Sequence, residues 1–115
     1  MTAIRLNQGS DVERVVLNKA SGFTRGECIL TRVGKVVHIS AHFYNSTDVA
    51  TNTALFETIP SALRPPFGYA IPAVLVNGGG DFAAYTLTVN ANGTVTQGFS
   101  GYMRSFFAAG EYQLA

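Results

Sequence analysis

Apolar and polar residues alternate with a period of two along most of the chain, in short runs that end at glycine, asparagine or proline. Almost nowhere do apolar residues recur at the spacing of an amphipathic helix. Short alternating runs are typical of strands in a β-sandwich or barrel. The pattern therefore predicts an all-β domain, with strands or extended segments at residues 14–18, 27–33, 35–44, 51–59, 70–76, 81–90, 94–99 and 102–107.

The run at residues 35–44 has two distinct faces. Successive side chains of a strand point to opposite sides of the sheet, so alternate residues share a face. Val37, Ile39, Ala41 and Phe43 form an apolar face, which we expect in the core. The opposite face is half-polar and carries Val36, His38, Ser40, His42 and Tyr44. Turns are expected on either side of this strand, at residues 33–35 and 45–48.

A proline-rich bend follows at residues 53–67, TALFETIPSALRPPF. Pro60 cannot donate to a sheet ladder, and the Pro65-Pro66 pair fixes φ and keeps the preceding residue out of helix. Prolines on both sides thus limit this segment to a short turn. Arg64 lies between Leu63 and Pro65, and we expect its guanidinium to bond neighbouring carbonyl groups in a structural role.

Residues 81–99 give the clearest hairpin. The run YTLTVNANGTV at residues 85–95 is an alternating strand, an Asn-Gly turn and the start of a second strand. Before it, the glycine run at residues 78–80 predicts a loop. In the first strand of the hairpin, Tyr85, Leu87 and Val89 share one face, and Thr86 and Thr88 share the other.

The order and spacing of the proline bend and this hairpin resemble the C-terminal head domains of bacteriophage receptor-binding and tail-fibre proteins, such as those of lactococcal siphophages. The resemblance covers about residues 27–115. It implies a trimeric, jelly-roll-like barrel at the tip of the phage tail, and a linker or virion-attachment segment at residues 1–26. It also implies that the protein binds a host saccharide. In related heads a His, an Asp and a Trp hold the sugar; the matching positions here are Thr86, Thr88 and Gln97, and this chain has no Trp.

Composition narrows the class of protein. Charged residues make up 13% of the 115 residues, against about 25% in an average domain. The basic residues are scattered, which argues against nucleic-acid binding. No run reaches the ~20 apolar residues of a membrane span, and the N-terminus lacks the pattern of a secretory signal. We therefore expect synthesis in the host cytoplasm, with the phage particle as destination.

The sequence offers little catalytic or metal chemistry. Cys28 is alone and reads as a small buried hydrophobe. His38 and His42 lie about 13 Å apart along their strand, too far to share a metal. No fingerprint of a nucleotide-binding or hydrolase site occurs, and no spacing singles out a pair of acids for glycosidase chemistry. We expect no enzyme activity, no metal and no cofactor.

The final stretch, GYMRSFFAAGEYQLA, concentrates aromatic residues with Met103 and Arg104, a composition enriched at interface centres. Core burial and an oligomer interface explain it equally well. The leading hypothesis is a homotrimeric receptor-binding head that adheres to host saccharide and joins other virion tail proteins through its N-terminus. The alternatives are a structural adaptor or cap without a ligand, and a fragment of a carbohydrate-active enzyme.

Overall fold

The computed structural model describes residues 2–5, 12–76, 82–98 and 103–115. These residues form one antiparallel, eight-stranded sheet, and the only helical element among them is the short 3-10 turn η1 (Ser61–Leu63). The all-β prediction is confirmed. The strands are β1 (Thr2–Arg5), β2 (Val12–Asn18), β3 (Arg25–Val33), β4 (Val36–Val49), β5 (Tyr69–Val76), β6 (Phe82–Val89), β7 (Val95–Gln97) and β8 (Met103–Gln113).

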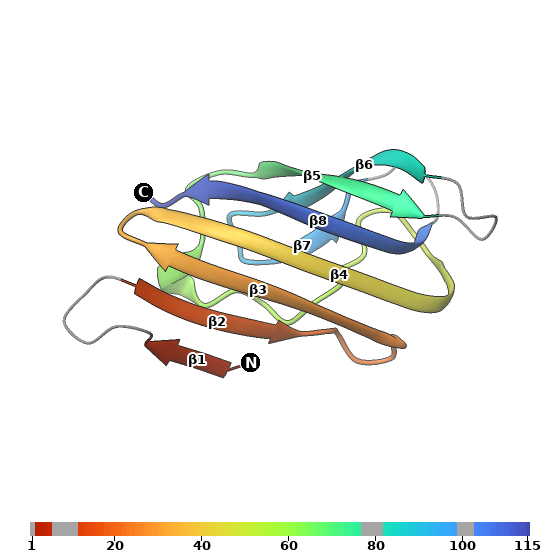
Figure 1. Cartoon of the computed structure of the whole chain (residues 1–115), viewed down its shortest axis with the longest axis horizontal. Coiled ribbons are helices and arrows are strands. Elements are labelled where there is room, and N and C mark those ends of the chain that lie inside the picture. Colours follow the sequence, from red (N-terminus) through yellow and green to blue (C-terminus); the bar gives the residue numbers. More distant parts are fainter. Residues whose placement is uncertain (1, 6–11, 77–81, 99–102) are drawn as a thin grey trace.

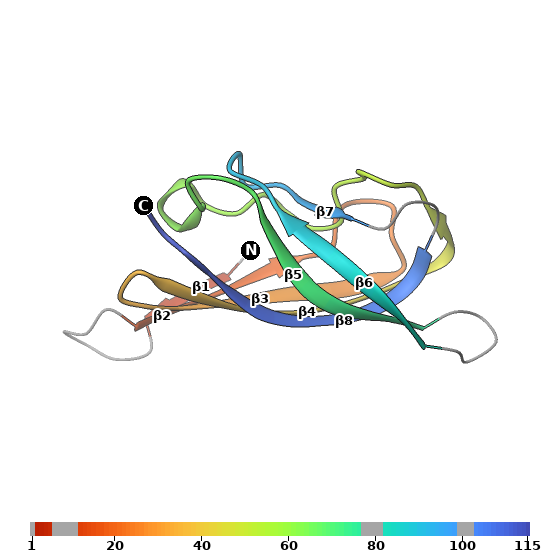
Figure 2. The same ribbon diagram turned by 90° about the horizontal axis from the view of Figure 1, so that it is seen from above.

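The strands lie in the order β1-β2-β3-β4-β8-β5-β6-β7, so the C-terminal strand β8 fills the centre of the sheet (Figure 1). The sheet curls, and β6 and β7 bend over the same side that the segment between β4 and β5 covers (Figure 2). This gives the sheet a covered inner face and an open outer face. The jelly-roll description of the head stays a prediction.

The inner face holds the core. In β4 the predicted apolar side is buried, with Val37, Ile39, Ala41 and Phe43 each at most 4% exposed. The Phe43 and Phe106 rings stack with centroids 5.7 Å apart. The segment between β4 and β5 closes the core from above with a further set of buried side chains: Leu55, Phe56, Ile59 and Leu63.

The predicted turn at residues 45–48 is wrong, because β4 continues to Val49. A register shift between Tyr44 and Val49 bends the strand without ending it. Asn45 explains how: its buried side chain accepts a hydrogen bond from the Thr24 amide at 3.0 Å and donates to the Thr47 carbonyl at 2.9 Å. The side-chain hydrogen bonds that make asparagine common in turns thus stabilise a bulge inside a strand here.

The last strand is longer than predicted. Residues 108–113, which lie beyond the strand predicted at residues 102–107, belong to β8. Tyr112 accounts for the extension: it pairs with Val37, is 1% exposed, and donates its hydroxyl to the Leu63 carbonyl at 2.7 Å. A buried phenol with a satisfied hydroxyl anchors the strand end to the proline bend.

The proline bend folds as expected. Pro60 precedes η1, and Arg64 is extended at φ −84° and ψ 141°, the region that a following proline enforces. The Arg64 Nε donates to the Ile59 carbonyl at 2.8 Å, and the Ile59 amide donates to the Gly93 carbonyl at 2.8 Å. Gly93 has φ +89°, and a Cβ there would collide with the Arg64 side chain. The bend is therefore fastened to the turn of the β6–β7 hairpin.

Part of the N-terminal segment also belongs to the sheet. The strand expected at residues 14–18 spans Val12–Asn18 and pairs along its whole length with β3. Val15 and Leu17 are in the core, and Lys19 bridges to Phe56. The division into a linker or attachment segment at residues 1–26 and a head domain after it stays a prediction. β2 lies within that predicted linker, but it is a fully paired strand of the sheet. The expected glycine loop at residues 78–80 lies outside the described residues.

Candidate functional site

The β6–β7 hairpin presents two of the predicted saccharide-binding residues on one surface. Tyr85, Leu87 and Val89 are at most 5% exposed and anchor the strand in the core. Thr86 and Thr88 point to the opposite, outer face and are half-buried there. The division of the strand into an apolar face and a threonine face is confirmed. Their hydroxyls are neutral groups that both donate and accept hydrogen bonds.

Gln97 does not join them. It pairs with Leu87, is fully buried, and its Nε2 donates to the Val49 carbonyl at 2.7 Å. The outer-face neighbour of Thr88 is instead Thr96, whose hydroxyl accepts a hydrogen bond from Nδ2 of the Asn90 side chain at 3.1 Å. Gln97 therefore fastens the hairpin to the end of β4.

The sequence contained the signal for this inward orientation. Val95 is an apolar strand residue and is fully buried, and a period of two places Gln97 on the same side as Val95. The resemblance, which supplied Gln97 as a site residue, does not take account of this alternation. The site that the geometry assembles on the hairpin is a patch of threonines: Thr86, Thr88 and Thr96.

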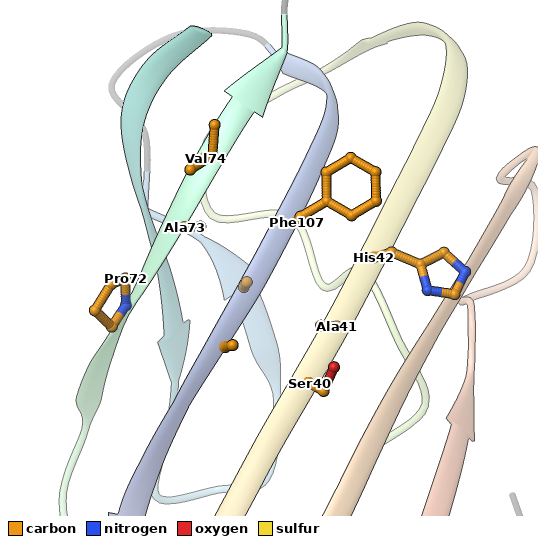
Figure 3. Close-up of a pocket in the computed structure, with 9 residues that line it drawn as sticks. Ser40, Ala41, His42, Pro72, Ala73, Val74 and Phe107 are labelled. Atoms are coloured by element: carbon orange, nitrogen blue, oxygen red, sulfur yellow. The ribbon is translucent and has the colours of Figure 1, made fainter.

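A second feature lies on the outer face at β4, β8 and β5. A hollow of about 500 Å³ opens there and is shown in Figure 3. Phe107, 62% exposed, and Val74, 44% exposed, are cross-strand partners on its border. The sequence indicated only a core or interface role for the aromatic residues of this final stretch, which include Phe107. The other lining residues are Ser40, Ala41, His42, Pro72, Ala73, Ala108 and Ala109.

The two histidines lie on the outer face of β4, as predicted. His38 faces Glu111 across the β4–β8 pair, with His38 Nδ1 3.5 Å from Glu111 Oε2 and both side chains more than half exposed. Such an exposed pair contributes little to stability. Within the described residues, no group of three or more His, Cys, Asp or Glu side chains comes together as a metal site.

The described acidic residues that form ion pairs are distributed over separate places. Besides Glu111, Glu13 lies 3.5 Å from Arg32, and Asp48 lies 2.9 Å from Arg104. None of these pairs brings two carboxylates together in the way that glycoside hydrolysis requires. The absence of enzyme activity stays a prediction.

Cys28 is buried in the core, as predicted. Burial raises the pKa of its thiol to about 12, because the interior disfavours the thiolate. A thiol in this state is a poor nucleophile. Burial likewise raises the pKa of the Tyr85 and Tyr112 phenols. These three groups are structural.

Comparison with known proteins returns no family. Neither the family models nor the curated proteins that were searched contain a match to this chain. Among the described residues, no helix is long and apolar enough to cross a membrane.

Proposed function

We propose that this chain is the head domain of a phage receptor-binding protein, which adheres to a saccharide on the host cell surface. The proposal begins from the resemblance of residues 27–115 to such heads. The segments that carry the resemblance, the proline bend and the β6–β7 hairpin, are fastened to each other through Arg64, Ile59 and Gly93. They therefore form one local unit.

The observation that carries the proposal is the threonine patch. Thr86 and Thr88 lie on the outer face of β6, and Thr96 lies opposite Thr88 on β7. On β5 the cross-strand partners of Thr86 and Thr88 are Pro72 and Ala70, which offer flat apolar surface. Neutral hydroxyls beside apolar surface match a sugar, which has a hydroxyl rim and apolar C–H faces.

In this proposal the head is jelly-roll-like and assembles as a homotrimer at the tip of the phage tail. It joins other tail proteins through its N-terminus. Support for assembly comes from apolar side chains that an isolated chain leaves exposed, which commonly mark contact surfaces: Val33, Phe67, Val74 and Phe107. Three linked weak sites would give strong adhesion without covalent chemistry, metal or cofactor.

A structural adaptor or cap without a ligand is the second candidate. The same exposed side chains favour it, because Phe107 and Val74 together form an apolar area on the outer face. An adaptor would cover this area with another virion protein. The third idea, a carbohydrate-active enzyme, has no geometric observation in its favour.

A glycan array probed with the purified chain tests the proposal. We expect a defined set of glycans to bind, and binding to fall when Thr86→Val and Thr88→Val are combined. Valine keeps the strand propensity and removes the hydroxyl. Thr31→Val, on the outer side of β3, is the matched control and should bind as the wild type does. An array without any signal would favour the adaptor, and release of sugar from host cell wall would indicate an enzyme.

A further inference from the structure

The hollow on the outer face has a structural cause in the divergence of two strands. β5 pairs with β8 at only three positions, from Leu75–Phe106 to Ala73–Ala108. The next residue of β5 is Pro72, which has no amide hydrogen to donate to a ladder. The opening beside Pro72 is lined on β8 and β4 by residues with small side chains: Ser40 and Ala109 on the outer face, and Ala41 and Ala108, whose side chains are buried.

Larger side chains border this opening. Along the outer face, Val74, Phe107 and His42 lie in one row across β5, β8 and β4. Figure 3 shows the Phe107 ring projecting beside β4, above the level of Ser40. Four residues further along β4 and β8, beyond the Ser40–Ala109 pair, His38 and Glu111 form another row on the same face. The hollow therefore has an apolar floor, an aromatic border and a polar border.

The exposed ring of Phe107 is the main reason to expect a ligand in this hollow. Its ring is 62% exposed, whereas the adjacent Phe106 is fully buried. The face of an aromatic ring carries partial negative charge and attracts the slightly positive C–H groups of an apolar sugar face. Burying such a ring against a ligand removes apolar surface from water, which favours binding.

The polar groups around the hollow favour a neutral ligand. Ser40 offers a hydroxyl and His42 an imidazole, and both are exposed. The nearby charges are engaged elsewhere, since Glu111 lies against His38 and the Arg25 guanidinium stacks on the Tyr44 ring at 4.9 Å. A few hydrogen-bonding groups at the edge of an apolar hollow fix the orientation of a ligand without requiring that it be charged.

We propose that this hollow binds one pyranose ring of the host saccharide, with the apolar face of the sugar on Phe107 and its hydroxyls toward Ser40 and His42. This inference rests on the proposed function and extends its site. Pro72 borders the hollow and is the cross-strand partner of Thr86. One saccharide chain can therefore run from the hollow across Pro72 to the threonine patch.

This assignment leaves a different apolar surface for contacts between copies. Val33 is 49% exposed at the end of β3, and Phe67 is 61% exposed and stacked on Tyr69 with ring centroids 5.1 Å apart. Tyr69 in turn packs near Tyr112, the partner of Val37. Val33 and Tyr112 both pair near the end of the sheet where β3 turns into β4, so these side chains lie toward that end, away from Phe107.

The experiment is an NMR titration of the isotope-labelled chain with the methyl glycosides of glucose, galactose and N-acetylglucosamine. At least one glycoside should shift the amide signals of Ser40, Ala108 and Ala109. Phe107→Ala should weaken its affinity about fivefold to tenfold, the range of one lost aromatic contact. Phe107→Tyr keeps the ring and should bind as the wild type does. Ala109→Leu fills the hollow from an exposed position and should abolish the shifts.

Phe67→Ala is the matched control, because it removes an equally exposed aromatic ring outside the hollow. It should leave the sugar shifts unchanged, and light scattering should show that Phe107→Ala leaves the oligomeric state unchanged. If sugars bind but the Phe107→Ala and Ala109→Leu variants bind them equally well, the hollow is not the site, although the proposed function stands. If Phe107→Ala instead breaks an oligomer, the outer face is a contact between copies. If no glycoside, and no glycan on the array, binds at all, the proposed function fails together with this inference.

Discussion

Replacing Arg64 with alanine should destabilise the fold without changing the preference for sugars. The Arg64 Nε donates to the Ile59 carbonyl at 2.8 Å in a partly buried position. Ile59 is also the residue whose amide reaches Gly93 in the hairpin turn. Arg64 thus supports the contact between the proline bend and the β6–β7 hairpin directly, with its side chain beside Gly93, and it is not on the outer face that carries the threonine patch.

The size of the effect follows from the kind of hydrogen bond. A hydrogen bond from a charged donor contributes about 1.5–3 kcal/mol, and partial exposure of this one places it near 2 kcal/mol. For a domain of this size, each kcal/mol moves the melting temperature by about 4 °C. We therefore expect the Tm of Arg64→Ala to fall by about 8 °C in a thermal melt followed by circular dichroism.

Arg104→Ala is the control for this measurement. It removes an arginine that is half exposed and pairs with Asp48 on the surface, an interaction that contributes at most about 1 kcal/mol. Its Tm should therefore fall by no more than about 4 °C. A melting curve of Arg64→Ala identical to that of the wild type, combined with loss of glycan binding, would refute the structural role and place Arg64 in the binding site.

Three further predictions concern the hairpin, the core and avidity. Gln97→Leu removes the donor to the Val49 carbonyl and should cost about 1–3 kcal/mol in urea unfolding while leaving the set of bound glycans unchanged; a changed set at unaltered stability would return Gln97 to the site. Burial raises the pKa of Cys28 from 9.0 to about 12. The contribution of this buried thiol to the free energy of unfolding is therefore fully present below pH 9 and is lost as the pH rises toward 12, because the unfolded state loses the thiol proton first. The fall should be shallower in Cys28→Ala, and equal slopes in the two proteins would contradict this assignment. Combining Thr86→Ala with Thr88→Ala should weaken a monovalent sugar modestly, at about 0.5–1.5 kcal/mol per hydrogen bond, and reduce adhesion to whole cells far more steeply; wild-type values in both assays would remove the threonine patch from the site.

Alternation in the sequence was sufficient to predict β4 and β6, because each has one side in the core and a strand shows this directly as a period of two. It failed at Asn45, where a side chain typical of turns instead satisfies backbone groups inside a bulge. Local sequence does not distinguish these two uses, since the difference depends on Thr24, a residue of another segment. It also failed at the end of β8, where burial of Tyr112 against Leu63 continues the strand.

The candidate site was predicted in part. Thr86 and Thr88 followed from the face opposite Leu87, but Gln97 was misplaced because its buried partner, the Val49 carbonyl, is distant in sequence. The hollow could not be predicted, since it depends on β8 lying between β4 and β5 and on the pairing of β5 and β8 stopping at Ala73. Phe107 then appears as an exposed ring beside small residues, which no sequence neighbour indicates.

A crystal structure of the chain soaked with a glycan selected on the array tests the central claim most directly, because it shows the sugar and the assembly at once. We expect three copies around a threefold axis. Saccharide density should lie on the outer face, with hydroxyls bonded to Thr86 or Thr88 and one ring against Phe107. A saccharide bound elsewhere on the molecule, or an outer face fully covered by neighbouring copies with no sugar on it, would contradict the account.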